Sequence, residues 1–275
     1  MNNKELKLLH NKILEIAKYF DEFCIENDIT YYLMGGTALG AIRHKGFIPW
    51  DDDYDVFMDY NNYIKLLRIV KHKVDKSKYY FQKEDTEEWP MFFSKLRMNQ
   101  TTFIEKDVVG RAMHHGVYID IMCLNNTSSN KYIRYIQYFC ARALNTRAIG
   151  LKGYITNSYT KKIAIVVSQI FIRGVIKKYM LQFVRSFNSK ETALVGHFFG
   201  RAPFQKTSFK RAYINQTRYV NFENLKLPVA YCAEEYLKIR YGVRYMDMPS
   251  DEEKMKYPSH AYIVDTLNDY NSYMT

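Results

Sequence analysis

The amino-acid sequence predicts an α+β fold, in which a small mixed sheet with flanking helices is followed by a mainly helical C-terminal part. Three observations predict it. An amphipathic helical pattern at residues 4–26 precedes the first strand-like run, further short apolar runs fall before residue 125, and long helical patterns follow residue 130. We therefore expect a core in residues 1–125, and a helical, basic region with a closing tail in residues 126–275.

The expected elements of the first half alternate between helix and strand. Residues 4–26 carry apolar side chains at helical spacing of three and four. A strand at 31–34 then ends at Gly35-Gly36-Thr37, a helix at 38–45 follows, and Gly46 stands where a C-terminal cap would lie. After a loop at 47–50 we expect a strand at 54–58, a helix at 60–74 and strands at 79–83, 91–98 and 118–123.

The expected elements of the second half are mostly helices. They are placed at about 130–148 and 160–187, with a short strand near 219–222, a helix near 230–241 and an irregular tail. The longest apolar stretch, residues 163–172, is interrupted by polar residues and falls short of the roughly 20 residues that a membrane span needs. Charged residues are spread through positions 1–30, so we expect no signal peptide there, and the four cysteines are scattered. We expect a cytoplasmic protein.

The positive charge is concentrated in one segment. The chain has 40 Lys and Arg against 29 Asp and Glu, yet residues 121–190 contain no acidic residue. Such a segment attracts anionic groups. Within it, residues 160–187 combine apolar and basic side chains, which is typical either of an interfacial helix on anionic lipid or of a core helix with solvated lysines. We expect peripheral association with the inner face of the membrane, and no specific nucleic-acid partner because no DNA-binding motif is present.

The glycine turn is the first feature with chemical meaning. Glycines let the backbone approach a ligand closely, and the N-terminus of the following helix offers N–H groups to a phosphate. Gly35, Gly36 and Thr37 are therefore candidate phosphate-binding residues. Standing alone, the turn is equally well explained as a simple strand-to-helix connection.

The second feature is a row of carboxylates at 51–55 that runs into an apolar strand. Because side chains alternate along an extended chain, Asp51, Asp53 and Asp55 are expected to share one face. Carboxylates held side by side repel one another unless a cation lies between them, and oxygen ligands suit Mg²⁺ or Mn²⁺. Asp120, inside the apolar strand at 117–124, is a candidate third ligand or general base. The alternative reading is a solvated acidic loop.

These residues resemble a known family. A glycine turn, an Asp-x-Asp pair and one more strand carboxylate are similar to the nucleotidyltransferase superfamily, and the string Gly35–Val56 resembles the LicD family of phosphorylcholine transferases, to which the fukutin-related proteins are also similar. Weaker resemblance extends to residues 221–229, 236–245 and 258–260, whereas residues 127–200 match nothing. Tyr54 stands where the LicD pattern usually has Ile or Val.

The resemblance implies an activity and a set of site residues. LicD enzymes transfer a phospho-alcohol from a CDP-linked donor to a sugar hydroxyl of a cell-surface or lipid-linked glycan, and CMP leaves. Asp53, Asp55 and Asp120 match the metal-binding carboxylates, Gly36 and Thr37 match the phosphate-contacting turn, and Asp51 shares their face. We expect Mg²⁺ or Mn²⁺ as the cofactor and phosphocholine as the transferred group. Asp120 or Asp51 is expected to take the proton from the acceptor hydroxyl.

Further candidate residues lie around this core motif. The residues expected to contact the diphosphate or the donor are Arg43, His44, Lys45 and Trp50, and Glu223 and His260 in the weakly matching tail are further candidates. For Arg43 and Lys45 a basic helix end is an equally good explanation, and Trp50 is better explained by packing on the carboxylate loop.

Two alternatives to phosphocholine transfer remain within the fold. One is transfer of glycerol phosphate or ribitol phosphate from the corresponding CDP donor. The other is a true nucleotidyltransferase that attacks the α-phosphate and releases pyrophosphate. A third alternative, of a different class, is a nucleic-acid or membrane-binding protein that has kept an inactive transferase body, and the intact row of aspartates argues against it.

Overall fold

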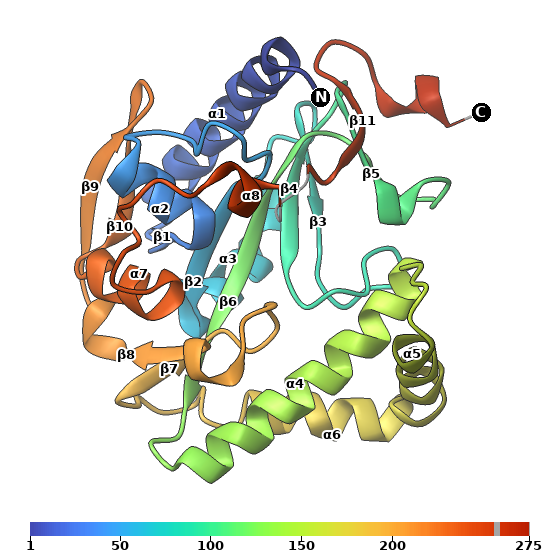
Figure 1. Ribbon diagram of the computed structural model, residues 1–275, viewed down its shortest axis with the longest axis vertical. Helices are drawn as coiled ribbons and strands as arrows, with labels where there is room; N and C mark the ends of the chain where they lie inside the picture. Colours follow the sequence, from blue (N-terminus) through green and yellow to red (C-terminus); the bar gives the residue numbers. More distant parts are fainter. Residues whose placement is uncertain (256–258, 275) are drawn as a thin grey trace.

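The computed structural model describes residues 1–255 and 259–274, and its centre is a mixed sheet (Figure 1). The strand order is β3 (Tyr79–Gln82), β4 (Ser94–Met98), β6 (Tyr118–Thr127), β2 (Asp55–Asp59), β1 (Tyr32–Leu33), β10 (Leu225–Ala230) and β9 (Thr217–Phe222). The pairs β2–β6 and β1–β10 are parallel, and the other neighbours in this order are antiparallel. The α+β class and the mixed sheet expected from the sequence are confirmed.

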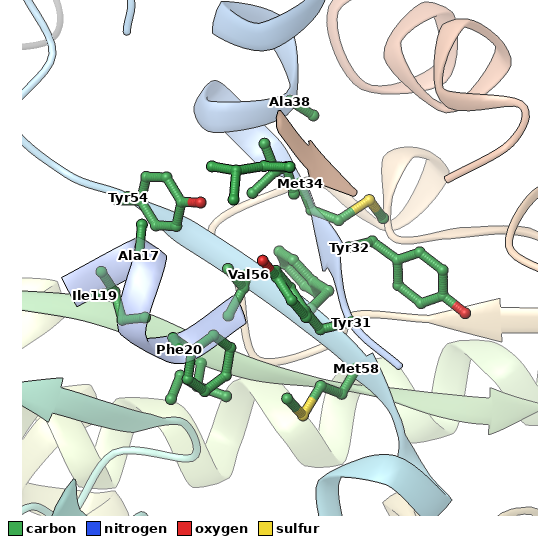
Figure 2. Packing of buried hydrophobic residues seen from close by; sticks show 14 of the residues in the cluster. Ala17, Phe20, Tyr31, Tyr32, Met34, Ala38, Tyr54, Val56, Met58 and Ile119 are labelled. Carbon is green, nitrogen blue, oxygen red and sulfur yellow. The ribbon is translucent and has the colours of Figure 1, made fainter. Parts of the chain in front are cut away.

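Two helices bury their apolar faces on the middle strands. α1 (Asn3–Glu26) and α3 (Tyr60–Lys73) contact β6, and α1 places Leu9, Ile13 and Phe20 in the core. Figure 2 shows Phe20 packed near Val56 and Ile119, which belong to β2 and β6. The helical periodicity at residues 4–26 is therefore confirmed, because the stripe it defines is the one that meets the sheet.

A second group of helices lies beside the sheet and has its own small core. α4 (Lys131–Lys152) packs against both α5 (Tyr159–Phe171) and α6 (Gly174–Val184). Trp89, Phe92, Leu144 and Phe198 are among the buried residues of this core. The single helix expected at 160–187 is wrong, because it breaks at residues 172–173, where Ile172 has a non-helical backbone and the next helix begins at Gly174 with φ of +54°.

The chain returns to the sheet after these helices. β7 (Leu194–Gly196) pairs with the end of β6, and β8 (Ser208–Lys210) pairs with β7. β10 is not among the elements expected from the sequence, and although it contains Pro228, which is unusual in an inner strand, it pairs with both β1 and β9. Strands that precede residue 125 and strands that follow it thus belong to the same sheet.

The tail is more ordered than expected. The sequence predicts an irregular segment after 241, but β11 (Ala261–Asp265) pairs with β5 (Thr102–Glu105), a strand that was also missed. Neither strand is more than five residues long, so the alternation signal within each is weak. The remaining helical elements of the described residues are α2 (Gly35–Arg43), α7 (Ala233–Tyr241), α8 (Asp251–Lys254), and the 3₁₀ turns at Lys106–Val108, Phe204–Lys206, Arg211–Tyr213 and Tyr270–Tyr273. Within the described residues, none of the helices has the length and apolar character needed to cross a membrane.

Candidate active site

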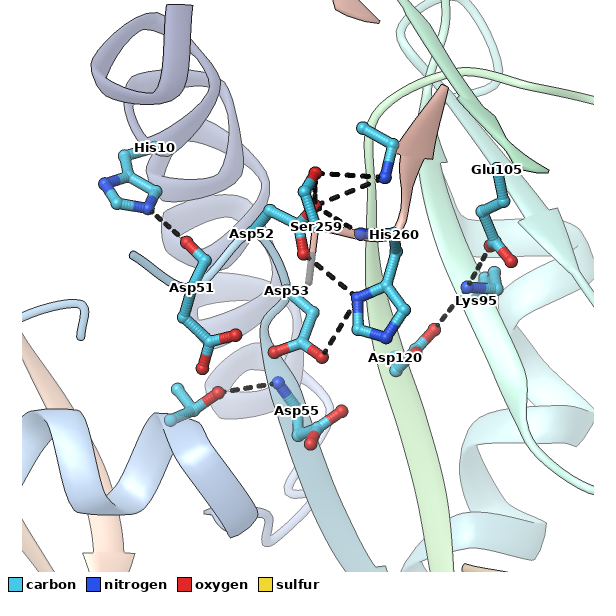
Figure 3. A network of polar contacts seen from close by, with 12 residues as sticks. His10, Asp51, Asp52, Asp53, Asp55, Lys95, Glu105, Asp120, Ser259 and His260 are labelled. Atoms are coloured by element: carbon cyan, nitrogen blue, oxygen red, sulfur yellow. Dashed lines mark hydrogen bonds and ion pairs between the residues drawn. The ribbon is translucent and has the colours of Figure 1, made fainter. Parts of the chain in front are cut away.

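The parallel pairing of β2 with β6 brings two of the predicted carboxylates together. Asp55 lies directly opposite Asp120 in the register. The backbone N–H of Asp120 donates to the carbonyl of Tyr54 at 2.8 Å, which extends the pairing by one residue. Asp51 and Asp53 precede β2, and Figure 3 shows their side chains near that of Asp55. The structure thus brings the side chains of Asp51, Asp53, Asp55 and Asp120 into one group, as the sequence predicts.

The glycine turn lies against this carboxylate cluster, defined as Asp51, Asp53, Asp55 and Asp120. α2 (Gly35–Arg43) begins at the first glycine rather than at Ala38 as expected, so both glycines belong to its first turn. A Cβ on Gly35 would lie 2.9 Å from Asp55 Oδ2, and one on Gly36 would lie 2.8 Å from Asp51 Oδ2. Only residues without a side chain allow this approach, and Gly35 also has φ of +63°.

Thr37 ties the turn to the strand. Its Oγ1 accepts a hydrogen bond of 2.8 Å from the backbone N–H of Asp55. The hydroxyl therefore fixes the distance between the start of α2 and the start of β2. Its role as a phosphate contact stays a prediction, which rests on the backbone N–H at the N-terminus of α2.

Asp52 points away from the cluster and holds the tail. Its side chain is 3% exposed and accepts hydrogen bonds from Ser259 Oγ at 2.6 Å, from the His260 backbone N–H at 2.8 Å and from His260 Nδ1 at 3.0 Å. Burial raises the pKa of Asp52, but these hydrogen bonds outweigh it and hold the pKa below its usual value. Sequence analysis did not single out Asp52, whose partners lie more than 200 residues away.

His260 is brought to the edge of the cluster by that contact. Its Nδ1 is 3.9 Å from Asp53 Oδ2, and the hydrogen bond to Asp52 raises the pKa of the imidazole against the opposing effect of burial. The structure thus places this tail residue, a candidate in the sequence, beside the carboxylates. Pro258, which precedes it in the resembling tail, lies outside the described residues.

Lys95 is a site residue that sequence analysis missed. Its side chain is 2% exposed, and its Nζ lies 2.8 Å from Asp120 and 3.2 Å from Glu105. Lys152 of α4 contacts the same Glu105 at 2.6 Å, so a chain of alternating charges runs from α4 into the cluster. A signal was present, because a lysine interrupts the buried strand expected at 91–98.

The four carboxylates of the cluster have pKa values above the usual range for aspartate. Burial, reinforced by the neighbouring Asp53 and Asp52, raises the pKa of Asp51 to about 8. Burial and the charges of Asp53, Asp120 and Asp51 hold the pKa of Asp55 well above its usual value, and burial also raises the pKa of Asp53 and of Asp120. Lys95 acts in the opposite direction on Asp120. A cation would relieve this repulsion.

The donor set fits a hard divalent cation that shares its ligands with a substrate. In the part of the chain that the structure describes, no group of three or more His, Cys, Asp or Glu residues is arranged to hold an ion by itself. Mg²⁺ is commonly bound by one or two carboxylates together with phosphate oxygens and water. The pKa values of Asp51 and Asp55, which burial and then the neighbouring carboxylates raise, agree with such a shared site.

The cations that follow the glycine turn make protein contacts. Arg43 donates through Nη1 to the carbonyls of Tyr245 and Asp247, each at 3.0 Å, and so holds the segment after α7. Lys45 Nζ donates to the carbonyl of Ile42 at 3.1 Å. Contact of these residues with a diphosphate stays a prediction.

His44 and Trp50, which come before and within the loop that precedes the carboxylates, contact each other. Their rings meet edge to face, with centroids 6.1 Å apart, and Lys254 Nζ lies 5.0 Å from the Trp50 ring centroid. Trp50 is half-buried against the main core. The packing role given to Trp50 agrees with these contacts.

Glu223 supports the loop after α2. Its Oε1 accepts a 3.1 Å hydrogen bond from the backbone N–H of Phe47, and its own N–H donates to the carbonyl of Lys45 at 2.7 Å. A Cβ on Gly46 would lie only 2.0 Å from that Oε1, so Gly46 serves this contact rather than capping the helix, whose C-cap is His44. These contacts describe a structural role, and a role in the reaction stays a prediction.

Comparison with known proteins finds a family whose domain resembles the part of the chain that carries this site. Residues 28–134 match the nucleotidyltransferase domain of the LicD, fukutin and fukutin-related proteins (LicD/FKTN/FKRP). These residues include the glycine turn and the whole carboxylate cluster.

Individual relatives agree with this match. The lipopolysaccharide cholinephosphotransferase LicD of Haemophilus influenzae is 29% identical over 273 residues, which is 95% of this chain and all of the relative. An uncharacterized protein of Rickettsia prowazekii is 38% identical over 58 residues, covering 21% of this chain and 22% of that protein. Residues 28–134 therefore resemble a LicD-type nucleotidyltransferase domain, and the chain is similar over 95% of its length to a protein named as a cholinephosphotransferase.

Proposed function

We propose that the protein transfers phosphocholine from CDP-choline to a sugar hydroxyl of a cell-surface polysaccharide or lipid-linked glycan and releases CMP. The observation that carries the proposal is the carboxylate cluster set against the glycine turn at the start of α2. The name of the relative that matches over its full length, a lipopolysaccharide cholinephosphotransferase, supports the choice of transferred group and acceptor.

The first turn of α2 would bind the donor phosphates. Its N-cap residue, Met34, makes no side-chain hydrogen bond to that turn, and Gly36 and Thr37 present their backbone N–H groups at the positive end of the helix. Because neither glycine has a side chain, a diphosphate can approach the backbone there.

The carboxylates would hold the cation on which the chemistry depends. When bound, Mg²⁺ or Mn²⁺ supplies neutralisation of the diphosphate charge, and Asp53, Asp55 and Asp120 are the residues that would hold it. Lys95 keeps Asp120 in place through their 2.8 Å contact, and Thr37 does the same for the backbone of Asp55.

The transfer itself is a displacement at phosphorus. The oxygen of the acceptor hydroxyl forms a bond to the phosphorus of phosphocholine, the bond from that phosphorus to the CMP oxygen breaks, and CMP departs with the electron pair. The hydroxyl proton passes to a carboxylate of the cluster, Asp51 or Asp120. An acceptor that is lipid-linked would be met at the inner face of a membrane, so we include peripheral association with an anionic membrane in the proposal.

The test is CMP release in the presence of Mg²⁺ and an oligosaccharide or lipopolysaccharide acceptor, with CDP-choline, CDP-glycerol, CDP-ribitol and CTP offered in turn. We expect CMP from CDP-choline, and none from Asp53→Asn. Asp28→Asn is the matched control, because its fully exposed carboxylate pairs only with the surface residue Lys65. CMP from another CDP-alcohol alone would replace choline in the proposal, and pyrophosphate from CTP alone would overturn it in favour of nucleotidyl transfer.

A further inference from the structure

α5 has its apolar side turned away from the protein. Ser168 is its only buried residue, and the side chains around it that meet α4 are Ile165 and Gln169, which lie against Gly150. The apolar residues that face solvent are Ile163 (47% exposed), Val166 (53%), Val167 (45%), Ile170 (52%) and Phe171 (63%). This is the reverse of the usual arrangement, in which a surface helix buries its apolar stripe in the core.

These exposed residues form one stripe along the helix. Their positions follow the spacing i, i+3, i+4, i+7 and i+8, which places them on one face of an α-helix. Isolated exposed apolar residues are normal on a protein surface, whereas a continuous stripe marks a surface that something else covers.

The neighbouring helices extend the apolar exposure. α6 has one buried residue, Val184, and exposes Val175, Ile176 and Tyr179 at 52–66%. α4, on which both helices pack, exposes Tyr132 and Phe139 at 81% and 62%. Figure 1 shows these three helices grouped together beside the sheet.

The charges around the stripe identify the partner. Lys161 and Lys162 are exposed in the first turns of α5, and Arg173 and Lys178 are exposed beyond its C-terminal end. No acidic residue occurs between 121 and 190, so two copies of this surface would repel each other, whereas an anionic surface would attract it.

We propose that the apolar stripe of α5 and the exposed lysines and arginine around it dock the protein on an anionic lipid bilayer, with α5 lying in the interface. At about 1.5 Å per residue, its 13 residues reach only about 20 Å, less than the roughly 30 Å hydrocarbon core, so the helix lies along the membrane surface. The inference deepens the proposed function, on which it rests for the idea of a lipid-linked acceptor, but the binding itself does not require that function.

Flotation of the full chain with vesicles tests the stripe. The wild-type chain is expected to float with vesicles of phosphatidylglycerol and phosphatidylcholine and to stay at the bottom with phosphatidylcholine alone. The double variant Val166→Asp/Ile170→Asp is expected to lose flotation with an unchanged melting temperature, because both side chains are already exposed. Val243→Asp is the matched control, since Val243 is 83% exposed outside these helices.

The basic residues are tested by charge neutralisation. Lys161→Gln and Lys162→Gln are each expected to lower the partition coefficient about fivefold at low salt, since one Lys near an anionic surface contributes about 1 kcal/mol. Added salt is expected to weaken binding of the wild-type chain.

The outcomes separate docking from catalysis. Retained flotation in Val166→Asp/Ile170→Asp would overturn the docking surface. It would also be overturned if the wild-type chain forms a dimer that does not bind vesicles and the same double variant is monomeric. CMP release with a soluble acceptor is measured on the same preparations. Loss of flotation with retained release supports the docking surface, and a chain that floats but releases no CMP from any donor would contradict the proposed function alone.

Discussion

Replacing Lys95 with methionine removes the buried cation that holds Asp120. The ammonium lies 2.8 Å from Asp120, 3.2 Å from Glu105 and 3.2 Å from the centroid of the Tyr118 ring, and the side chain is 2% exposed. At an effective dielectric constant near 20, the two carboxylate contacts give attractions of about 6 and about 5 kcal/mol, which offset the cost of burying the ammonium.

The stability lost in Lys95→Met depends on whether each carboxylate that contacts Lys95 keeps another cation nearby. Glu105 retains Lys152, but Asp120 is left buried beside Asp55 without its cation. Removing one partner of a buried pair costs about 3–5 kcal/mol, so Lys95→Met is expected to lower the free energy of unfolding by that amount. Transfer activity is expected to fall as well, because Asp120 is no longer held in position.

Urea denaturation followed by circular dichroism measures the first effect. Lys238→Met is the control, since its pair with Glu235 is exposed and its loss is expected to leave stability nearly unchanged. The double variant Lys95→Met/Asp120→Asn is expected to recover part of the stability without recovering activity. A loss below about 1 kcal/mol in Lys95→Met would refute the reasoning.

Three further predictions concern the turn, the loop and acid stability. Gly36→Ala is expected to reduce turnover with little loss of stability, because the new Cβ displaces the Asp51 carboxylate, and unchanged turnover would contradict this contact. Glu223→Ala is expected to lower the free energy of unfolding, measured by urea denaturation, by about 1–3 kcal/mol, because the Phe47 N–H loses its acceptor. Glu223→Gln keeps an acceptor oxygen and is expected to retain both stability and turnover. A loss of turnover in Glu223→Gln without a loss of stability would instead give the charge of Glu223 a role in the reaction. Burial, reinforced by Arg97, lowers the pKa of His114 to about 4 in the folded chain. Between pH 6.5 and 4 the unfolded chain therefore binds one more proton, and the free energy of unfolding falls as the pH is lowered, by at most about 1.4 kcal/mol per pH unit. His114→Gln is expected to make this pH dependence less steep, and an equally steep dependence in the variant would contradict the prediction.

The three aspartates at 51, 53 and 55 were predictable as a group because their information is local, whereas Asp120 joins them only through the pairing of β2 with β6. Residues 51–54 precede the strand, yet burial alternates along them: Asp52 and Tyr54 are buried, whereas Asp51 and Asp53 are partly buried and turn to the site (Figure 3). Tyr54 is fully buried between Phe47 and Phe222, as expected for the inner face.

The partners of the cluster could not be predicted from local patterns. Lys95 meets Asp120 only because β4 pairs with β6, and His260 meets Asp52 across 208 residues of chain. The break between α5 and α6 was missed because apolar residues continue through it, and the exposure of the α5 stripe depends on which side α4 covers. These features arise from tertiary packing, which the periodicity of one segment does not encode.

The most direct test of the central claim is the rate of choline phosphate transfer in Asp53→Asn and Asp55→Asn, measured with CDP-choline, Mg²⁺ and a glycan acceptor, beside wild type and Asp28→Asn. If the carboxylate cluster carries the reaction, both variants lose at least about 100-fold in rate while keeping the wild-type fold, and Asp28→Asn keeps the wild-type rate. Transfer at a near wild-type rate in either cluster variant would contradict the account.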